Sequence, residues 1–231
     1  MYKSIFISDI HLGSAHCQSQ DFFNLLEKIE SEKIFLIGDI INASTPQEHP
    51  DVIKFINLLE SKPWEIIYIG GNHEEDRKKF PPVSLSFKEK LLPIKNYIYN
   101  NGKEQIYIEH GHKFHESNII NIILKKMAIS LRFKGLNKNK KRVKKRDKKK
   151  SFYHKIMKPI AQKLLINSFR RYIIFTTQKN NCSIAIAGHF HLPEDKRIQN
   201  IRYLNCGDWV KNRSYITENQ NSEFFLHTKS N

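Results

Sequence analysis

Five short blocks of this sequence carry side chains that often bind metal ions. The blocks hold Asp, His and Asn beside glycine or apolar residues, and in chain order they are Asp9-Ile10-His11, Gly38-Asp39, Gly71-Asn72-His73-Glu74, His110 and Gly188-His189-Phe190-His191. Carboxylate, amide and imidazole groups together suit divalent cations such as Mn²⁺, Fe²⁺ and Zn²⁺. The sequence therefore predicts a metal site built from distant parts of the chain.

Seven of these side chains are predicted metal ligands, enough for two ions: Asp9, His11, Asp39, Asn72, His110, His189 and His191. Asp9 and His11 are two residues apart, so on extended backbone both would leave the same face; His189 and His191 have the same spacing. Asp39 is suited to bridge two ions because a carboxylate has two oxygens. Two such cations activate water and hold phosphoryl oxygens, so the expected chemistry is hydrolysis of a phosphate ester.

Each block alone supports a metal site only weakly, because a single His or Asp at a strand end is more often a surface or hydrogen-bonded residue. The prediction depends on five blocks in one order, each after a predicted strand. We expect no metal at five other histidines: His16, His49, His112, His154 and His227.

A short apolar run rich in β-branched residues precedes every block. These runs are predicted to be buried strands, at residues 5–7, 34–37, 66–69, 106–108 and 184–187. In open α/β sheets the carboxyl ends of the strands deliver their loops to one edge, so the ligands should meet there. Residues 21–29 have the apolar spacing of a helix. Three closely spaced strands after His189, at 201–204, 214–217 and 223–226, are expected to form a second, antiparallel layer.

The five blocks resemble the signature of the calcineurin-like metallophosphoesterase family, which reads D-x-H, G-D, G-N-H-[DE], H and G-H-x-H. The resemblance implies an α/β fold, a four-layer α/β/β/α sandwich of two mixed sheets with a helical cap insertion. It assigns one metal to Asp9, His11, Asp39 and His191, and the other to Asp39, Asn72, His110 and His189. His73, with Asn72, would face the substrate as a catalytic residue. It also implies two divalent ions, Mn²⁺ first and Fe or Zn²⁺ as alternatives.

The size and charge of the chain predict one catalytic core with an appended element. The chain has 231 residues, and we expect residues 1–115 and 180–231 to form the core and 116–179 a basic helical cap insertion. The net charge is +16, and residues 138–150 contain ten Lys or Arg and one Asp. This basic segment indicates a phosphate-rich partner, unless it is simply a solvated loop.

A narrower resemblance, to the UDP-2,3-diacylglucosamine pyrophosphatase group, rests on residues 204–210 and on the insertion. It implies hydrolysis of this nucleotide-activated glycolipid to UMP and 2,3-diacylglucosamine 1-phosphate in lipid A biosynthesis. Apolar stripes of the insertion would hold acyl chains, and its basic residues would meet the anionic inner membrane surface. The substrate contacts expected on this basis are Arg77, Ile123, Met127, Lys144, Lys145 and Arg146.

Two positions depart from the family pattern. Asn42 stands where many relatives carry an Asp that orients the substrate-facing His. An amide can still hydrogen-bond an imidazole but cannot stabilise its cation. His73 should therefore be a poorer general acid than the equivalent His of those relatives. A phosphate leaving group hardly needs protonation, so this change favours cleavage of a diphosphate. His115 replaces an acid found in many relatives, and we assign it no role.

Two other functions remain open on the sequence. The basic segment would also suit a phosphodiesterase acting on nucleic acid or another nucleotide, although no aromatic residues alternate with its charges. A non-catalytic scaffold of the same fold is the other alternative, and the complete ligand set argues against it. Without a signal peptide or a long apolar run, the protein is expected in the cytoplasm, peripheral on the inner membrane face, with three reduced cysteines.

Overall fold

A computed structural model describes residues 1–46, 48–75, 92–116 and 158–229. The chain divides into two compact units, one formed by Met1–His112 with Ile173–Asn231 and the other by Lys113–Tyr172. Helix α7, Lys158–Lys179, runs through the second junction. The predicted domain boundaries, after residues 115 and 179, stay predictions. Within the described ranges, no helix is both long and apolar enough to cross a membrane.

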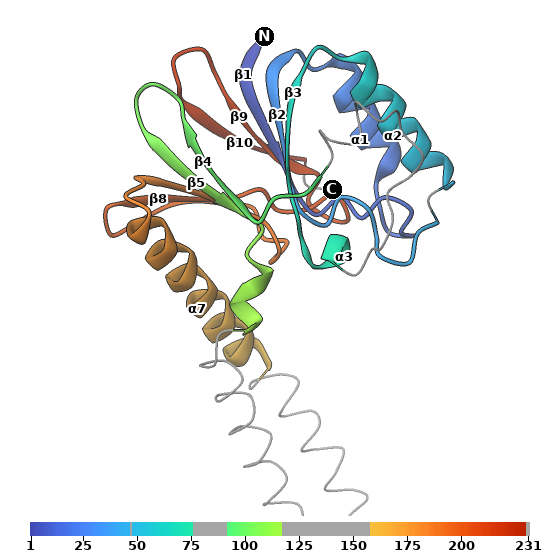
Figure 1. The fold of residues 1–231 in the computed structure, drawn as a ribbon. Coiled ribbons are helices and arrows are strands. Elements are labelled where there is room, and N and C mark those ends of the chain that lie inside the picture. The colour runs from blue at the N-terminus through green and yellow to red at the C-terminus, as the bar shows by residue number, and fades with distance from the viewer. Residues whose placement is uncertain (47, 76–91, 117–157, 230–231) are drawn as a thin grey trace, which may run out of the picture. The chain divides into compact units, whose positions relative to one another are not determined.

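The first sheet holds five strands in the order β10-β9-β1-β2-β3 (Figure 1). Its strands are β1 Tyr2–Ile7, β2 Ser31–Ile37, β3 Glu65–Ile69, β9 Ser214–Glu218 and β10 Phe224–Thr228. Strands β1, β2 and β3 are parallel, while β9 is antiparallel to β1 and β10 to β9. The carboxyl ends of the three parallel strands therefore lie at one edge, as the site requires.

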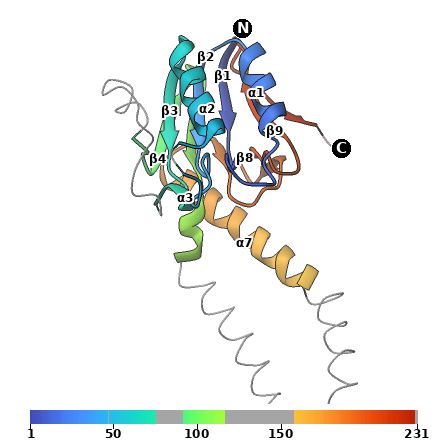
Figure 2. The same ribbon diagram turned by 90° about the vertical axis from the view of Figure 1, so that its right-hand side faces the viewer.

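Two helices cover the outer face of this sheet (Figures 1 and 2). Helix α1, Ser19–Lys28, buries Phe22, Phe23 and Leu26, as the predicted amphipathic spacing required. Helix α2, Pro50–Ser61, begins with proline at its first turn and with His49 Nδ1 accepting the amide N–H of Asp51 at 3.2 Å. Both helices pack into one apolar cluster with the β1 and β2 side chains that face them.

The second sheet has the order β4-β5-β6-β8-β7. Its strands are β4 Asn96–Asn100, β5 Gln105–Glu109, β6 Ile184–Ala187, β7 Glu194–Ile198 and β8 Ile201–Asn205. Strands β5, β6 and β8 run parallel, and β4 and β7 are antiparallel edge strands. The end of α7 belongs to the same unit: Gln178 Nε2 donates to Gln199 Oε1 at 2.9 Å, in the turn between β7 and β8.

An apolar core fills the space between the two sheets. Phe6 of β1 stacks on Phe35 of β2 with ring centroids 4.6 Å apart, and Tyr99 of β4 lies 5.1 Å from Phe35. Ile186 and Leu204 of the second sheet belong to the same cluster. Strands buried on both faces must be apolar throughout, which explains the unbroken runs in the sequence. The predicted sandwich of two mixed sheets flanked by helices is confirmed.

One prediction about the sheets is wrong. The three strands after His189 do not form a separate antiparallel layer: β8 lies in the second sheet, while β9 pairs with β1 in the first, with Phe6 opposite Ile216. A short apolar run marks a strand but does not encode its partner. Helix is confirmed for 158–179 of the predicted helical region; residues 117–157 lie outside the described ranges.

Candidate metal centre

The five sequence blocks directly follow the ends of β1, β2, β3, β5 and β6, and backbone hydrogen bonds draw them together. The amide N–H of Asp9 donates to the Gly38 carbonyl, and that of His11 to the Asp39 carbonyl, both at 3.0 Å. Between the sheets, the His189 N–H donates to Asp9 Oδ2 at 2.8 Å. The loops of the two sheets thus meet at one edge, as predicted.

The ligand loops are not extended, contrary to the expectation from the spacing of Asp9 and His11. Five of the predicted ligands have a left-handed backbone with φ between 53° and 70°: Asp9, His11, Asp39, His189 and His191. Non-glycine residues seldom adopt this region, and such residues cluster at functional sites. Sharp turns in the loops, rather than alternation along a strand, therefore aim the side chains at one another.

Two glycines make room for this crowding. A Cβ on Gly38, whose φ is 74°, would lie 2.5 Å from Cγ of the His110 ring. A Cβ on Gly188 would collide with the Ser8 hydroxyl and lie 2.6 Å from Asp9 Oδ2. Any side chain at either position would push a predicted ligand aside, so both positions favour glycine.

Potential ligand atoms gather in three groups, each within 4.8 Å: Asp9, His11 and His191; Asp39, His110 and His189; His11, Asp39 and His73. The first two groups match the two ligand sets that the family resemblance implies, apart from Asn72 and from Asp39 in the first set. His191 Nε2 lies 3.1 Å from Asp9 Oδ1, and His110 Nε2 lies 3.6 Å from Asp39 Oδ2. The arrangement could hold two divalent cations side by side.

Two predicted ligand atoms support this fit because they are buried and make no hydrogen bond within the described part of the chain. Asn72 Oδ1 and His110 Nε2 make no hydrogen bond to any residue that the structure describes. Leaving buried polar atoms unpaired is costly, so such atoms call for a ligand. His110 Nδ1 donates to the Ile37 carbonyl at 2.9 Å, which leaves Nε2 facing Asp39. The donor set suits a Mn²⁺, Fe or Zn²⁺ ion, and the identity of the metal is not defined by it.

Strong electrostatic coupling joins these groups in the metal-free protein. Burial by itself would raise the pKa of Asp39, but His110 and His73 lower it well below its ordinary value. Burial by itself would lower the pKa of His110, but Asp9 and Asp39 raise it to about 9. The pKa of His191 likewise rises to about 10, because Asp208 and Asp9 outweigh its burial. Both imidazoles thus favour the protonated form when no metal is bound.

His73 lies beside the ligands with its ring fixed by the backbone. Its Nδ1 accepts the N–H of Ala43 at 3.0 Å, and its own N–H donates to Asp39 Oδ1 at 2.9 Å. The Asn42 amide donates to Ser44 Oγ at 2.8 Å. Because Nδ1 accepts, the proton of the neutral ring lies on Nε2, 3.8 Å from Asp39 Oδ2.

Glu74 is a functional residue that the sequence did not single out. Its buried carboxylate accepts the N–H groups of Asp39 at 2.7 Å, Gly71 at 2.8 Å and Ile40 at 2.9 Å, together with the Tyr68 hydroxyl at 2.9 Å. It thereby ties the loop after β2 to the short helix α3, Asn72–Glu75. Its place in the Gly-Asn-His-Glu block was the only signal that could have found it.

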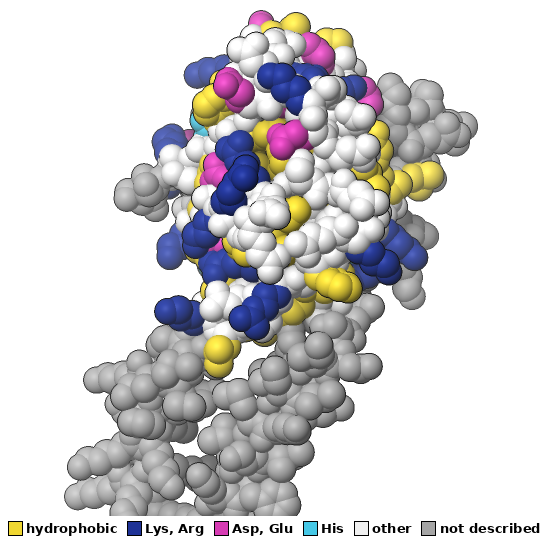
Figure 3. Space-filling model, turned by 90° about the vertical axis from the view of Figure 1, so that its left-hand side faces the viewer, with side chains coloured by type: hydrophobic (Ala, Val, Ile, Leu, Met, Phe, Trp, Pro, Cys, Tyr) yellow, Lys and Arg dark blue, Asp and Glu magenta, His cyan; other side chains and the backbone are white. Residues whose placement is uncertain are grey.

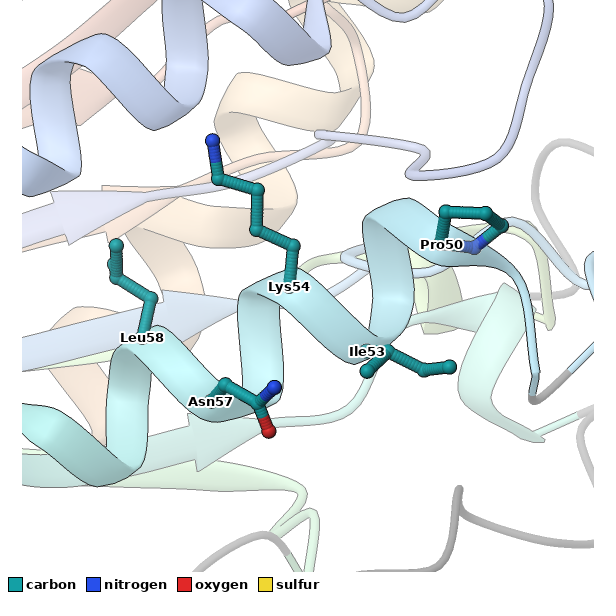
Figure 4. Close-up of a pocket in the computed structure, with 5 residues that line it drawn as sticks. All are labelled: Pro50, Ile53, Lys54, Asn57 and Leu58. Atoms are coloured by element: carbon teal, nitrogen blue, oxygen red, sulfur yellow. The ribbon is translucent and has the colours of Figure 1, made fainter.

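Six predicted substrate contacts lie outside the described residues: Arg77, Ile123, Met127, Lys144, Lys145 and Arg146. His115 falls in a 3₁₀-helix, His112–Glu116, and still has no assigned role. A shallow hollow on α2, between Pro50 and Leu58, includes none of the predicted ligands (Figure 4).

Comparison with known proteins agrees with the fold and the site. The model of the calcineurin-like phosphoesterases matches residues 2–193. Because this match spans most of the chain, the protein belongs to the calcineurin-like phosphoesterase family, whose name denotes cleavage of phosphate esters. No curated protein sequence matches the chain.

Several solved structures are similar to this chain at low identity. An archaeal phosphodiesterase is 12% identical with a TM-score of 0.52, covering 98% of this chain and 99% of its own. Vacuolar protein sorting protein 29 from Cryptosporidium parvum is 11% identical with a TM-score of 0.49, covering 99% and 97%. The phosphoesterase YfcE from E. coli is 15% identical with a TM-score of 0.45, covering 98% of each chain. The first of these supports the fold alone.

Proposed function

We propose that this protein is a two-metal hydrolase that cleaves a phosphoric anhydride or ester. The observation that carries the proposal is the meeting of two Asp and His ligand groups at the strand ends, where Asn72 Oδ1 and His110 Nε2 are buried and make no hydrogen bond to the described residues. Asp9, His11, Asp39 and His191 would hold one cation, and Asp39, Asn72, His110 and His189 the other. Two bound cations would supply an activated water and charge stabilisation for the phosphoryl oxygens.

His73 would contact the leaving group. Since its Nδ1 accepts from Ala43, the donor of the neutral ring is Nε2–H, on the side of Asp39. With no carboxylate on Nδ1 to stabilise an imidazolium, His73 would donate a hydrogen bond rather than transfer a proton. Such a group serves a leaving phosphate better than a leaving alkoxide, because a phosphate hardly needs protonation. This favours a diphosphate substrate.

The substrate that we propose is UDP-2,3-diacylglucosamine, cleaved to UMP and 2,3-diacylglucosamine 1-phosphate. Support comes from the preference for a diphosphate and from the resemblance of residues 204–210 and of the insertion to the corresponding pyrophosphatases of lipid A biosynthesis. Ile123 and Met127 would contact the acyl chains. The basic residues Lys144, Lys145 and Arg146 would bind the anionic inner membrane face from the cytoplasm, as a peripheral contact.

One assay tests this proposal. UMP release from UDP-2,3-diacylglucosamine should depend on Mn²⁺ and stop on chelation, with a kcat/KM at least about 100-fold above that for bis-p-nitrophenyl phosphate or single-stranded DNA, a difference of about 3 kcal/mol in barrier. The rates of UMP release with Fe²⁺ or Zn²⁺ in place of Mn²⁺ would rank the three metals. Fast hydrolysis of the soluble diester with no release of UMP would contradict the lipid substrate, but the protein would still be a phosphoesterase.

A nucleic-acid phosphodiesterase is the second candidate, and the charge of the surface is what favours it. Figure 3 shows Lys and Arg side chains spread over one described face, and Lys196 and Arg197 on the edge strand β7 are exposed. A basic surface attracts polyanions of any sequence, with an affinity that falls steeply with salt. Hydrolysis of single-stranded DNA faster than of the lipid substrate would favour this alternative.

A further inference from the structure

The loop between β8 and β9, residues 206–213, carries a buried carboxylate that the proposed reaction does not yet use. Asp208 is 3% exposed, and its Oδ2 lies 3.0 Å from Nδ1 of His191. Its Oδ1 accepts the backbone N–H groups of Lys211 at 2.8 Å and Asn212 at 2.7 Å. One oxygen is thus fixed by the loop and the other is presented to the imidazole.

The loop is hydrogen-bonded to the backbone of two predicted metal ligands, Asp9 and His191. The Trp209 N–H donates to the Asp9 carbonyl at 3.1 Å, and the Asn212 side-chain amide donates to the His191 carbonyl at 2.9 Å. The Trp209 ring is buried against Phe22 of α1, with centroids 5.1 Å apart. Asp208 therefore cannot swing away from His191 without breaking contacts in the core under α1.

We propose that Asp208 is the positioning residue that makes His191 a metal ligand. By accepting a hydrogen bond from Nδ1–H, its carboxylate keeps the lone pair of the neutral ring on Nε2, the nitrogen that faces Asp9 Oδ1 at 3.1 Å. A carboxylate behind a ligating histidine fixes the tautomer and the orientation of the ring, and removing it typically weakens metal binding about 10–100-fold. This role rests on the metal centre of the proposed function.

An asparagine at position 208 separates this role from a merely structural one. Its single oxygen can keep the two bonds from Lys211 and Asn212, and its NH₂ group then faces Nδ1 of His191. An NH₂ donor requires Nδ1 to accept, which puts the ring proton on Nε2 and removes the metal-binding lone pair. Asp208→Asn should therefore preserve the loop and impair the metal site.

The experiment measures Mn²⁺ binding to the full-length metal-free protein by the EPR signal of the free ion. Asp208→Asn should weaken one of the two sites about 10–100-fold and leave the other near the wild-type affinity. The matched control is Asp195→Asn, since Asp195 is a surface aspartate on β7 that accepts two hydrogen bonds from Arg202. This control should bind Mn²⁺ like the wild type.

A double-mutant cycle keeps the test decisive if Asp208→Asn loses some stability. Once His191 is replaced by Ala, Asp208→Asn should cause no further loss of Mn²⁺ affinity, because its effect passes through that ring. An additional loss of the same size in the His191→Ala background, or unchanged Mn²⁺ binding by Asp208→Asn in an active hydrolase, would overturn the inference alone. Two Mn²⁺ ions bound by a protein that cleaves no phosphoester would instead overturn the proposed function.

Discussion

Asp39 is the one residue that the family assignment shares between both metals. Its carboxylate lies within 4.0 Å of ring nitrogens of His11, His73 and His110, and it also accepts the His73 N–H. We predict that Asp39→Ala loses both ions and lowers kcat/KM by more than about 100-fold. This loss exceeds the roughly 10–100-fold loss that is usual for residues that only hydrogen-bond a metal ligand. Metal content by mass spectrometry and hydrolysis of bis-p-nitrophenyl phosphate provide the measurement.

Asp195→Ala is the control for this change, because it also removes a carboxylate, but from the partly exposed edge strand β7. It should retain the metal content and activity of the wild type. If Asp39→Ala kept two ions and near-normal turnover, the bridging role of Asp39 would be wrong.

Proton release on metal binding follows from the raised pKa values of His110, about 9, and His191, about 10. Both rings are protonated at pH 7 in the metal-free protein and must be neutral to bind a metal. We predict release of about two protons per chain at pH 7 as Mn²⁺ fills both sites, and an apparent affinity that rises with pH up to about 10, the higher of the two pKa values. Calorimetry in two buffers of different ionisation enthalpy measures this number.

Only the two imidazoles are expected to release protons at pH 7. The carboxylates of Asp9 and Asp39 have lowered pKa values and are already ionised at pH 7, so they contribute no protons. Binding heats that do not depend on the buffer, or an affinity that falls between pH 7 and 8, would show that the two imidazoles are neutral in the metal-free protein.

At the scale of the elements, helix α3 holds the site through one buried side chain. Glu74 accepts four backbone N–H groups and the Tyr68 hydroxyl, and these donors would lose their partner in Glu74→Ala. We predict a loss of about 3 kcal/mol in the free energy of unfolding, since each buried unpaired donor costs about 1–3 kcal/mol and water can reach some of them. Urea denaturation of the metal-free protein measures this loss.

The comparison is Glu30→Ala, because the Glu30 side chain is exposed and its backbone carbonyl, which accepts the Tyr2 N–H, is kept in the variant. This change should stay within about 0.5 kcal/mol of the wild type. A similar, small effect of both substitutions would mean that the Glu74 network contributes little to the stability of the loop after β2.

The sequence predicted most of the elements that deliver the ligands. Each apolar run before a block is a strand, because strands packed between two layers must be apolar on both faces, and the ligand types directly after them were visible in the sequence. The meeting of these blocks at one edge then follows from parallel strand order. Helix α1 could also be predicted, because its buried residues repeat at helical spacing along the sequence.

The remaining features depend on contacts between distant residues. Strand β9 reads as an apolar run whether it pairs with β1 or with β8, and β7, Glu194–Ile198, has only one buried residue because it is an edge strand. The acceptor roles of Glu74 and Asp208 are set by backbone N–H groups, which no residue pattern reveals. The left-handed turns at the ligands are likewise a result of packing.

At the scale of the whole molecule, the basic segment 138–150 and the catalytic unit should have separable functions. We predict that replacing Lys144, Lys145 and Arg146 by Gln weakens binding to anionic lipid vesicles by about 1 kcal/mol per charge. The effect should fade as salt is raised, and hydrolysis of a small soluble diester should not change. Vesicle sedimentation at two salt concentrations measures the binding.

Three exposed lysines elsewhere, Lys28, Lys95 and Lys179, give a charge-matched control. Their replacement by Gln should weaken vesicle binding less than the change in the basic segment. Equal losses in both variants, or a loss confined to single-stranded DNA, would contradict a membrane role for the segment.

The central claim is that two cations held by the Asp and His ligands make this chain a phosphoester hydrolase. The most direct test adds Mn²⁺ in small steps to the metal-free protein, at a concentration well above the dissociation constants, and follows hydrolysis of bis-p-nitrophenyl phosphate. Turnover should be absent without metal and should rise until about two equivalents have been added, then level off. Full activity without metal, or none at saturating Mn²⁺ despite two bound ions, would contradict the account.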